Sequence, residues 1–207
     1  ELRKLTTAQL QGPWQLPAEL VRRSLSAGAR TVEVELQRSG LKVRDDGAPL
    51  DRDRLRALAD LLAAAASPER RHRALLALEA AGALALLALP ATDPARVEVV
   101  ARGGGLSRRL EFSQHGRCAM HEETDPHGGR GTTVTVQGAE IALARARSFT
   151  SDACRFAPGV VRVDGEAASD GLRRYLAARE FALPQHLLTG HVALTHRGEQ
   201  ARIWVLV

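Results

Sequence analysis

The sequence predicts an α/β protein, an α+β sandwich in which helices cover one face of a mixed, mainly antiparallel sheet. Two observations favour this fold class. Short segments of alternating apolar residues recur along the 207 residues, and most are joined by tight turns that contain glycine. Segments with apolar residues three or four apart, typical of helices, lie between them. Strands joined by such turns pair antiparallel, and the helices supply the second layer.

The first elements illustrate both patterns. A proline in the first turn and a glycine just after the last predict a helix over residues 17–27. Strict alternation predicts a strand over residues 31–36. Ser39-Gly40 is typical of a hairpin turn into a second strand over 41–44, which the turn residues 45–49 end.

The same criteria predict the remaining elements. We expect helices over residues 52–66, 70–89, 141–147 and 171–181, and strands over residues 97–101, 108–112, 118–121, 132–136 and 160–163, the last turning at Asp164-Gly165. A hairpin over residues 190–194 and 202–207, turning at Arg197-Gly198, closes the chain.

Composition and charge exclude several classes of protein. Hydrophobic residues make up 44% and charged ones 26%, as in globular proteins, and 3% aromatic residues disfavour a base-stacking surface. The net charge of +5 permits nucleic-acid binding, but the arginine pairs are scattered over many elements and do not support it. His115, His121, His127 and Glu122-Glu123 match no metal-ligand spacing, and the two cysteines are too few and too isolated for a zinc site, so we expect no metal site. With no membrane span and no secretion signal, we expect a cytoplasmic protein.

Three short segments carry candidate chemistry. Glu19 lies on the first predicted helix, Asp45-Asp46-Gly47 ends a strand, and residues 129–133 form a glycine-rich loop just before another strand. Taken singly, an exposed helix carboxylate, a turn and a glycine-rich loop are commonplace. Their order along the chain is the informative feature.

Together these segments resemble the GHKL ATPases, the Bergerat-fold group, and most closely its MutL branch. Residues 19–29 read ELVRRSLSAGA, similar to that family's ELVENSLDAGA, and residues 43–47 read VRDDG, similar to its VRDNG. Residues 131–134 contain its GTT. The resemblance covers residues 5 to 150 and implies a nucleotide-binding domain over residues 1–150. Residues 151–207 are expected to form a strand–helix–hairpin extension packed on that domain.

The resemblance implies a site for the adenine base. Asp45 matches the carboxylate that accepts a hydrogen bond from the exocyclic amine of adenine. Gly47 matches the glycine that lets the backbone pass beneath the purine ring, where a side chain would collide. Thr132 or Thr133 adds a hydroxyl, directly or through water, on the same edge of the base. The implied ligand is therefore ATP or ADP.

The resemblance also implies a phosphate end, and here the chain departs from the family. Glu19 matches the general base that deprotonates the attacking water, and backbone amides near Gly82 would face the phosphates. The family's magnesium-binding asparagine is replaced by Arg23, which has no lone pair for a metal. Arg23 either contacts phosphate itself or makes a salt bridge or points to solvent. The phosphate lid has also lost glycines, in residues 79–84, so magnesium binding is in question.

These observations lead to a main hypothesis and two alternatives. The main one is a GHKL-like adenine-nucleotide-binding domain with a degenerate site, regulatory or scaffolding, with weak or no ATP hydrolysis. The first alternative is an active magnesium-dependent ATPase of the MutL or chaperone type. The second is a protein-interaction module on the same fold that binds no nucleotide. The expected partners are further domains of a longer chain or another protein.

Overall fold

The computed structural model describes residues 10–63, 66–80, 82–113, 117–171, 191–196 and 199–204. The chain divides into two compact units, residues 1–172 and residues 173–207. The second unit contains an antiparallel pair, β9 (His191–His196) and β10 (Glu199–Trp204), which confirms the closing hairpin with different bounds. The predicted helix over 171–181 lies outside the described residues apart from Gly171.

The first unit is a sheet with helices. Its helices are α2 (Leu16–Ser26), α3 (Arg52–Leu62), α4 (Pro68–Ala80) and α5 (Leu143–Cys154), with 3-10 segments η1 (Pro13–Gln15) and η2 (Leu84–Thr92). Its strands are β1 (Thr31–Gln37), β2 (Gly40–Asp45), β3 (Arg96–Gly103), β4 (Leu106–Ser113), β5 (Cys118–Thr124), β6 (Gly131–Gln137), β7 (Val160–Val163) and β8 (Glu166–Asp170).

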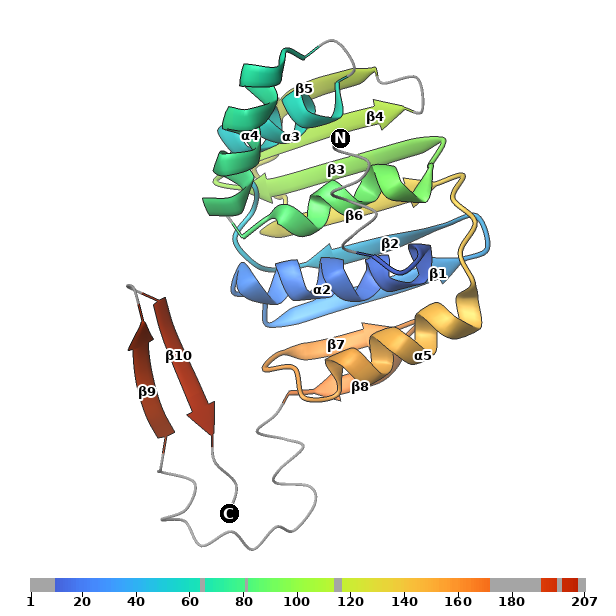
Figure 1. Ribbon diagram of the computed structural model, residues 1–207, viewed down its shortest axis with the longest axis vertical. Coiled ribbons are helices and arrows are strands. Elements are labelled where there is room, and N and C mark those ends of the chain that lie inside the picture. Colours follow the sequence, from blue (N-terminus) through green and yellow to red (C-terminus); the bar gives the residue numbers. More distant parts are fainter. Residues whose placement is uncertain are drawn as a thin grey trace, which may run out of the picture. The chain divides into compact units, whose positions relative to one another are not determined.

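The eight strands form one mixed sheet in the order β5-β4-β3-β6-β2-β1-β7-β8 (Figure 1). Every neighbouring pair is antiparallel except β1 with β7, which is parallel. In Figure 1, α2 and α5 lie across the near face of the sheet. The structure therefore confirms the predicted fold class.

Burial along the strands shows that one face carries the core. Val32 and Val34 of β1 and Val43 of β2 are at most 2% exposed, whereas the intervening Glu33 and Arg44 are exposed. Because successive side chains of a strand point to opposite faces, the helices cover only one of them. The apolar stripe of α2 packs on this covered face, and each fully buried leucine contributes about 1.5–3 kcal/mol to stability. The opposite face is polar.

Helix α2 confirms the prediction for residues 17–27 almost to the residue. Pro17 lies in the first turn, where no N–H is needed, and Gly28 has a φ of +76° just beyond the last turn. The N–H of Ala27 donates to the carbonyl of Arg23 at 3.0 Å. This C-terminal geometry aims the chain directly into β1.

Two predicted helices end earlier than expected. The helix over 52–66 stops at Leu62 because Ala63 is extended, with a ψ of 127°. The continuous helix over 70–89 is wrong: α4 ends at Ala80 and η2 follows. Gly82 lies between them with a φ of +63°, and Ala83 N–H donates to the Leu78 carbonyl at 2.9 Å. A left-handed glycine with such a bond terminates a helix, and this local geometry outweighs the helix propensity of the alanines and leucines.

The last part of the first unit extends the sheet. Helix α5 runs to Cys154 and not to residue 147, and β8, which the sequence analysis did not assign, pairs with β7. The turn between them is the expected one, since Asp164 and Gly165 both have positive φ, 52° and 83°, as a type I′ hairpin requires. Asp164 also accepts a hydrogen bond from the N–H of Leu36 at 2.7 Å. Residues 160–170 thus belong to the same sheet as β1.

Within the part of the chain that the structure describes, no helix has both the length and the apolar character needed to cross a bilayer.

Candidate functional site

Asp45, the expected adenine acceptor, ends β2 with its carboxylate turned into the covered face. Its Oδ2 accepts hydrogen bonds from Arg23 Nη1 at 2.9 Å and Ser24 Oγ at 2.7 Å. Its Oδ1 accepts from the N–H groups of Gly47 at 3.0 Å and Thr132 at 3.2 Å. The side chain is 2% exposed. Both oxygens therefore already have two donors each, and neither is open to a ligand in this conformation.

Arg23 is the cationic partner, and it comes from the buried stripe of α2. Its side chain is 4% exposed and its ion pair with Asp45 is closed at 2.9 Å. Burial lowers the pKa of Arg23, while the negative charge of Asp45 raises it and the positive charge of Arg54 lowers it further. Arginine retains its proton even in such surroundings, so this is a buried salt bridge. Of the two alternatives for Arg23, the structure has the salt bridge.

The three motif segments meet at this ion pair. The N–H of Ala48 donates to the carbonyl of Ala27 at 2.8 Å, which ties the DDG turn to the end of α2. A Cβ on Gly131 would lie 1.8 Å from the carbonyl oxygen of Asp45, and the φ of Gly131 is +134°. A Cβ on Gly47 would lie 3.0 Å from Ala27 O. The glycines therefore allow the chain's own segments to approach one another.

The two threonines of the GTT segment lie on opposite faces of the sheet, because strand residues alternate. Thr132 is 2% exposed on the covered face, and its Oγ1 is buried without a hydrogen-bond partner among the described residues. Thr133 lines a hollow on the open face. A buried hydroxyl without a partner costs about 1–3 kcal/mol, so Thr132 Oγ1 has capacity for a water or a ligand.

The expected phosphate end is only partly assembled. Glu19 lies on α2 in an exposed ion pair with Arg22, one turn further along the helix. Gly82 lines a hollow of about 200 Å³ together with Arg23, Ser26, Arg22 and Ala85. Ligand pockets for small molecules usually enclose about 300–1,000 Å³, so this hollow is small for a nucleotide. Glu19 does not line it.

The residues present do not fit the magnesium ion that the family resemblance implies. In the described part of the chain, no three His, Cys, Asp or Glu side chains are grouped so that they could hold a metal. The family's ligand position is Arg23, whose guanidinium is engaged with Asp45. A cation there would meet a positive charge and no lone pair.

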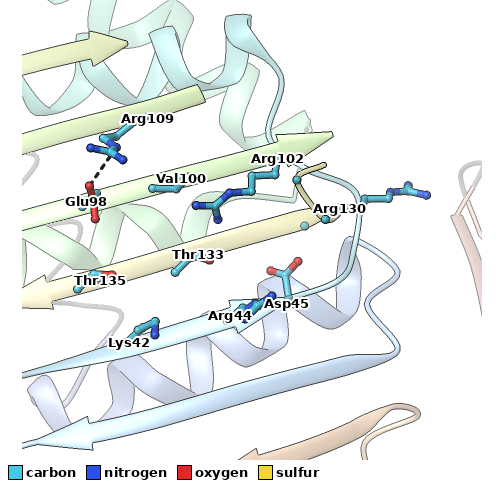
Figure 2. Close-up of a pocket in the computed structure, with 13 residues that line it drawn as sticks. Lys42, Arg44, Asp45, Glu98, Val100, Arg102, Arg109, Arg130, Thr133 and Thr135 are labelled. Atoms are coloured by element: carbon cyan, nitrogen blue, oxygen red, sulfur yellow. Dashed lines mark ion pairs between the residues drawn. The ribbon is translucent and has the colours of Figure 1, made fainter. Parts of the chain in front are cut away.

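A second hollow, of about 410 Å³, lies on the open face of the sheet, and the sequence analysis missed it (Figure 2). We call this hollow the sheet-face basin. The residues that line it are Lys42, Arg44, Asp45, Glu98, Val100, Arg102, Arg109, Gly128, Gly129, Arg130, Gly131, Thr133 and Thr135. They come from β2, β3, β4 and β6 and from the loop before β6. Alternation within each strand puts the strand side chains of this set on one face, except that of Asp45, whose carboxylate is turned to the covered face. Only the strand order shows which of them are neighbours.

Comparison with known proteins supports the fold. No family model matches the chain. It is 31% identical over 130 residues to a DNA mismatch repair protein MutL from Cellvibrio japonicus, an alignment that covers 56% of this chain and 21% of that protein. The chain thus spans about a fifth of the length of that curated relative.

Two solved structures share the architecture. The crystal structure of the N-terminal domain of a DNA repair protein has a TM-score of 0.53 at 16% identity, covering 93% of this chain and 64% of the other. The 43K ATPase domain of Thermus thermophilus gyrase B, in complex with an aminocoumarin, has a TM-score of 0.50 at 17% identity, with 88% and 51% covered. At these identities the likeness concerns the fold alone.

Proposed function

We propose that the nucleotide site of this chain is degenerate and closed by Arg23, from the premise that the chain is a GHKL-fold domain related in sequence to MutL. Its role is then regulatory or scaffolding, within a longer cytoplasmic protein, with weak nucleotide binding and little or no hydrolysis. The observation that carries this proposal is the buried ion pair between Arg23 and Asp45, with both carboxylate oxygens of Asp45 fully engaged.

The ion pair supports weak binding because an incoming adenine must displace Arg23 first. Leaving one partner of a buried salt bridge without the other costs about 3–5 kcal/mol. A cost of about 3 kcal/mol, at 1.4 kcal/mol per factor of ten, lowers an affinity more than a hundredfold. Any nucleotide contact must offset that cost before net binding is seen. The orphaned hydroxyl of Thr132 is the feature that favours some residual binding.

The surroundings of the phosphate end support slow or absent hydrolysis. Phosphoryl transfer depends on positioning and on neutralising the phosphate charge, much of which a bound metal supplies. Arg23 is unable to ligate a metal, and the glycine-poor lid region forms the end of α4 and the start of η2. Glu19, the residue that matches the general base, is held by Arg22 at the surface. A general base without an aligned water and an activated phosphate has little effect.

The test compares nucleotide binding in the unmodified chain, in Arg23→Asn and in Arg22→Asn. Arg22 is the matched control, since it adjoins Arg23 but its side chain is 71% exposed. In thermal melts with ATP or ADP, with and without magnesium, we expect small shifts for the unmodified chain and for Arg22→Asn. Arg23→Asn frees Asp45 and restores the family's residue, so its melting temperature should rise more with ATP than with GTP.

A second variant and a turnover assay distinguish the remaining outcomes. Arg23→Gln retains an N–H donor for Asp45 and replaces Arg23→Asn if that variant does not fold. Magnesium-dependent ATP turnover in the unmodified chain, abolished by Glu19→Ala, would establish the active ATPase instead. Nucleotide binding that is equally absent in the unmodified chain and in both Arg23 variants would favour the module that binds no nucleotide.

A further inference from the structure

We propose that the sheet-face basin is a binding site for a phosphoryl anion, on the opposite face of the sheet from the ion pair of Asp45. The ligand class is a phosphate-bearing group, held by arginine side chains and threonine hydroxyls on a rigid strand platform. The inference does not depend on whether nucleotide binds near Asp45, because the two sites lie on different faces.

Strand register brings the basic side chains together. Arg44 of β2 is opposite Thr133 of β6, Thr133 is opposite Val100 of β3, and Val100 is opposite Arg109 of β4. These residues form one row, in which Arg44 and Arg109 are three strand spacings apart, about 14 Å at roughly 4.8 Å each. Arg102 lies one alternate position further along β3 on the same face. In Figure 2 its side chain reaches over the row toward Thr133.

The charges of the basin are not balanced. Five of its lining residues are basic and two, Asp45 and Glu98, are acidic. The carboxylate of Asp45 is turned to α2 and neutralised by Arg23. Glu98 pairs with Arg109 at 3.2 Å, and Lys42 pairs with Glu35, which lies outside the lining, at 3.3 Å. The basin therefore keeps an excess of positive charge.

Two of the arginines have no charge partner at close range in the part of the chain that the structure describes. Among the described residues, neither Arg44 nor Arg130 has an acidic side chain within 4.0 Å, although Glu33 is opposite Arg44 in register on β1. Arg102 is paired with Asp125 only at 3.5 Å. In Figure 2, Arg130 extends away from the row, at the rim of the basin. Arg44 and Arg102 are thus the side chains best placed to bind an anion.

The chemistry of the lining selects phosphate. A guanidinium presents paired N–H groups that match two oxygens of a phosphoryl group, and the hydroxyls of Thr133 and Thr135 add neutral donors. A Cβ on Gly129 would meet nothing within 4 Å, so the loop leaves that side open. The volume of about 410 Å³ suits a small phosphorylated molecule. Val100 is the only large apolar side chain in the lining, so recognition is polar.

The experiment titrates the full chain with inorganic pyrophosphate as the probe and measures binding by calorimetry at about 50 and 200 mM salt. We expect saturable binding to the unmodified chain and about a tenfold loss of affinity in Arg44→Gln and in Arg102→Gln. The matched control is Arg96→Gln, on the same open face but outside the basin and paired with Glu111 at 2.8 Å. Arg96→Gln should bind as the unmodified chain does.

A second arm distinguishes the sources of the phosphoryl group. A free phosphorylated molecule is the source if pyrophosphate binds at least as tightly as a short single-stranded oligonucleotide. A nucleic-acid backbone is the source if the oligonucleotide binds much more tightly and Arg44→Gln lowers its salt-dependence slope by about one. The proposal is overturned if pyrophosphate does not saturate, or if Arg96→Gln weakens binding as much as Arg44→Gln. Arg23→Asn should leave pyrophosphate binding unchanged, which separates this test from that of the nucleotide site.

Discussion

The two faces of the sheet treat charge in opposite ways, and consecutive residues of β2 show the contrast. Asp45 points into the covered face, where its carboxylate has four donors and 2% exposure. Arg44 points to the open face and is exposed. On the covered face every charge requires a partner, because an unpaired buried charge is very costly. On the open face water solvates an arginine, so a cation can remain available for a ligand.

The contrast also shows how the chain's own side chains can occupy a buried carboxylate. The segments that resemble GHKL motifs are assembled around Asp45, and Arg23 of the same chain pairs with its carboxylate. The Arg23–Asp45 pair then serves the folded state. The proposed anion site lies instead on the open face, where side chains are not needed for packing.

The largest expected effect is the loss of the buried charge pair. Asp45→Asn keeps the shape but removes the charge that compensates Arg23, so we expect a loss of about 3–5 kcal/mol in the free energy of unfolding. The control is Asp46→Asn, at an exposed carboxylate that accepts two backbone N–H bonds, from Arg30 at 2.8 Å and Thr31 at 3.0 Å. That change should cost about 1 kcal/mol. Urea unfolding measures both losses. Equal losses would mean that the Arg23–Asp45 pair contributes no more stability than the hydrogen bonds of an exposed turn.

An intermediate effect is expected where the two faces meet, at the start of β6. Gly131→Ala places a Cβ against the carbonyl oxygen of Asp45 at a φ of +134°, so we expect a loss of about 1–3 kcal/mol from backbone strain. Gly129→Ala is the matched control, because a Cβ there meets nothing within 4 Å. Its stability should change by less than about 0.5 kcal/mol. A Gly131→Ala variant as stable as Gly129→Ala would show that this junction can relax freely.

The smallest effect on stability is expected on the open face. Glu98→Gln breaks the ion pair between Glu98, whose side chain is 28% exposed, and Arg109, whose side chain is 43% exposed. The free energy of unfolding should therefore fall by less than about 1 kcal/mol. The same change removes the negative charge that faces the sheet-face basin. Pyrophosphate affinity should therefore rise severalfold, measured by calorimetry beside the urea midpoint. A drop in affinity would show that Glu98 orients Arg109 for the anion.

Much of the fold was accessible from sequence because local rules decided it. Alternation predicted β1, and the pair of residues at 164–165 predicted the turn that the structure has, with two positive φ values. The helix over 70–89 could not be divided correctly, since alanine and leucine favour helix on both sides of Gly82. The structure ends the helix at this glycine, which has a φ of +63°, with a hydrogen bond from Ala83 N–H to the Leu78 carbonyl. The edge strand β8 is short and has no large apolar residue to indicate it.

The candidate site was less accessible, for a different reason. Arg23 lies seven residues after Leu16 and three after Leu20, on the apolar stripe of α2, so helical periodicity placed it on the buried side. That spacing was a usable signal for a buried ion pair, but not for its partner, which comes from a different element. The sheet-face basin depends on strand order, and sequence patterns specify which face a residue takes without specifying its neighbours.

The parallel pairing of β1 with β7 has a consequence for how the chain folds. Five strands, β2 to β6, are made between these two partners, so the outer edge of β1 stays without a partner until Val160–Val163 has been synthesised. An open strand edge invites pairing with other chains, and charged side chains are one means of discouraging it. Glu33 and Glu35 lie on that strand and stay exposed after folding. Contacts between residues so distant in sequence also slow folding. The edge of β1 therefore stays open for longer, and during that time Glu33 and Glu35 discourage aggregation.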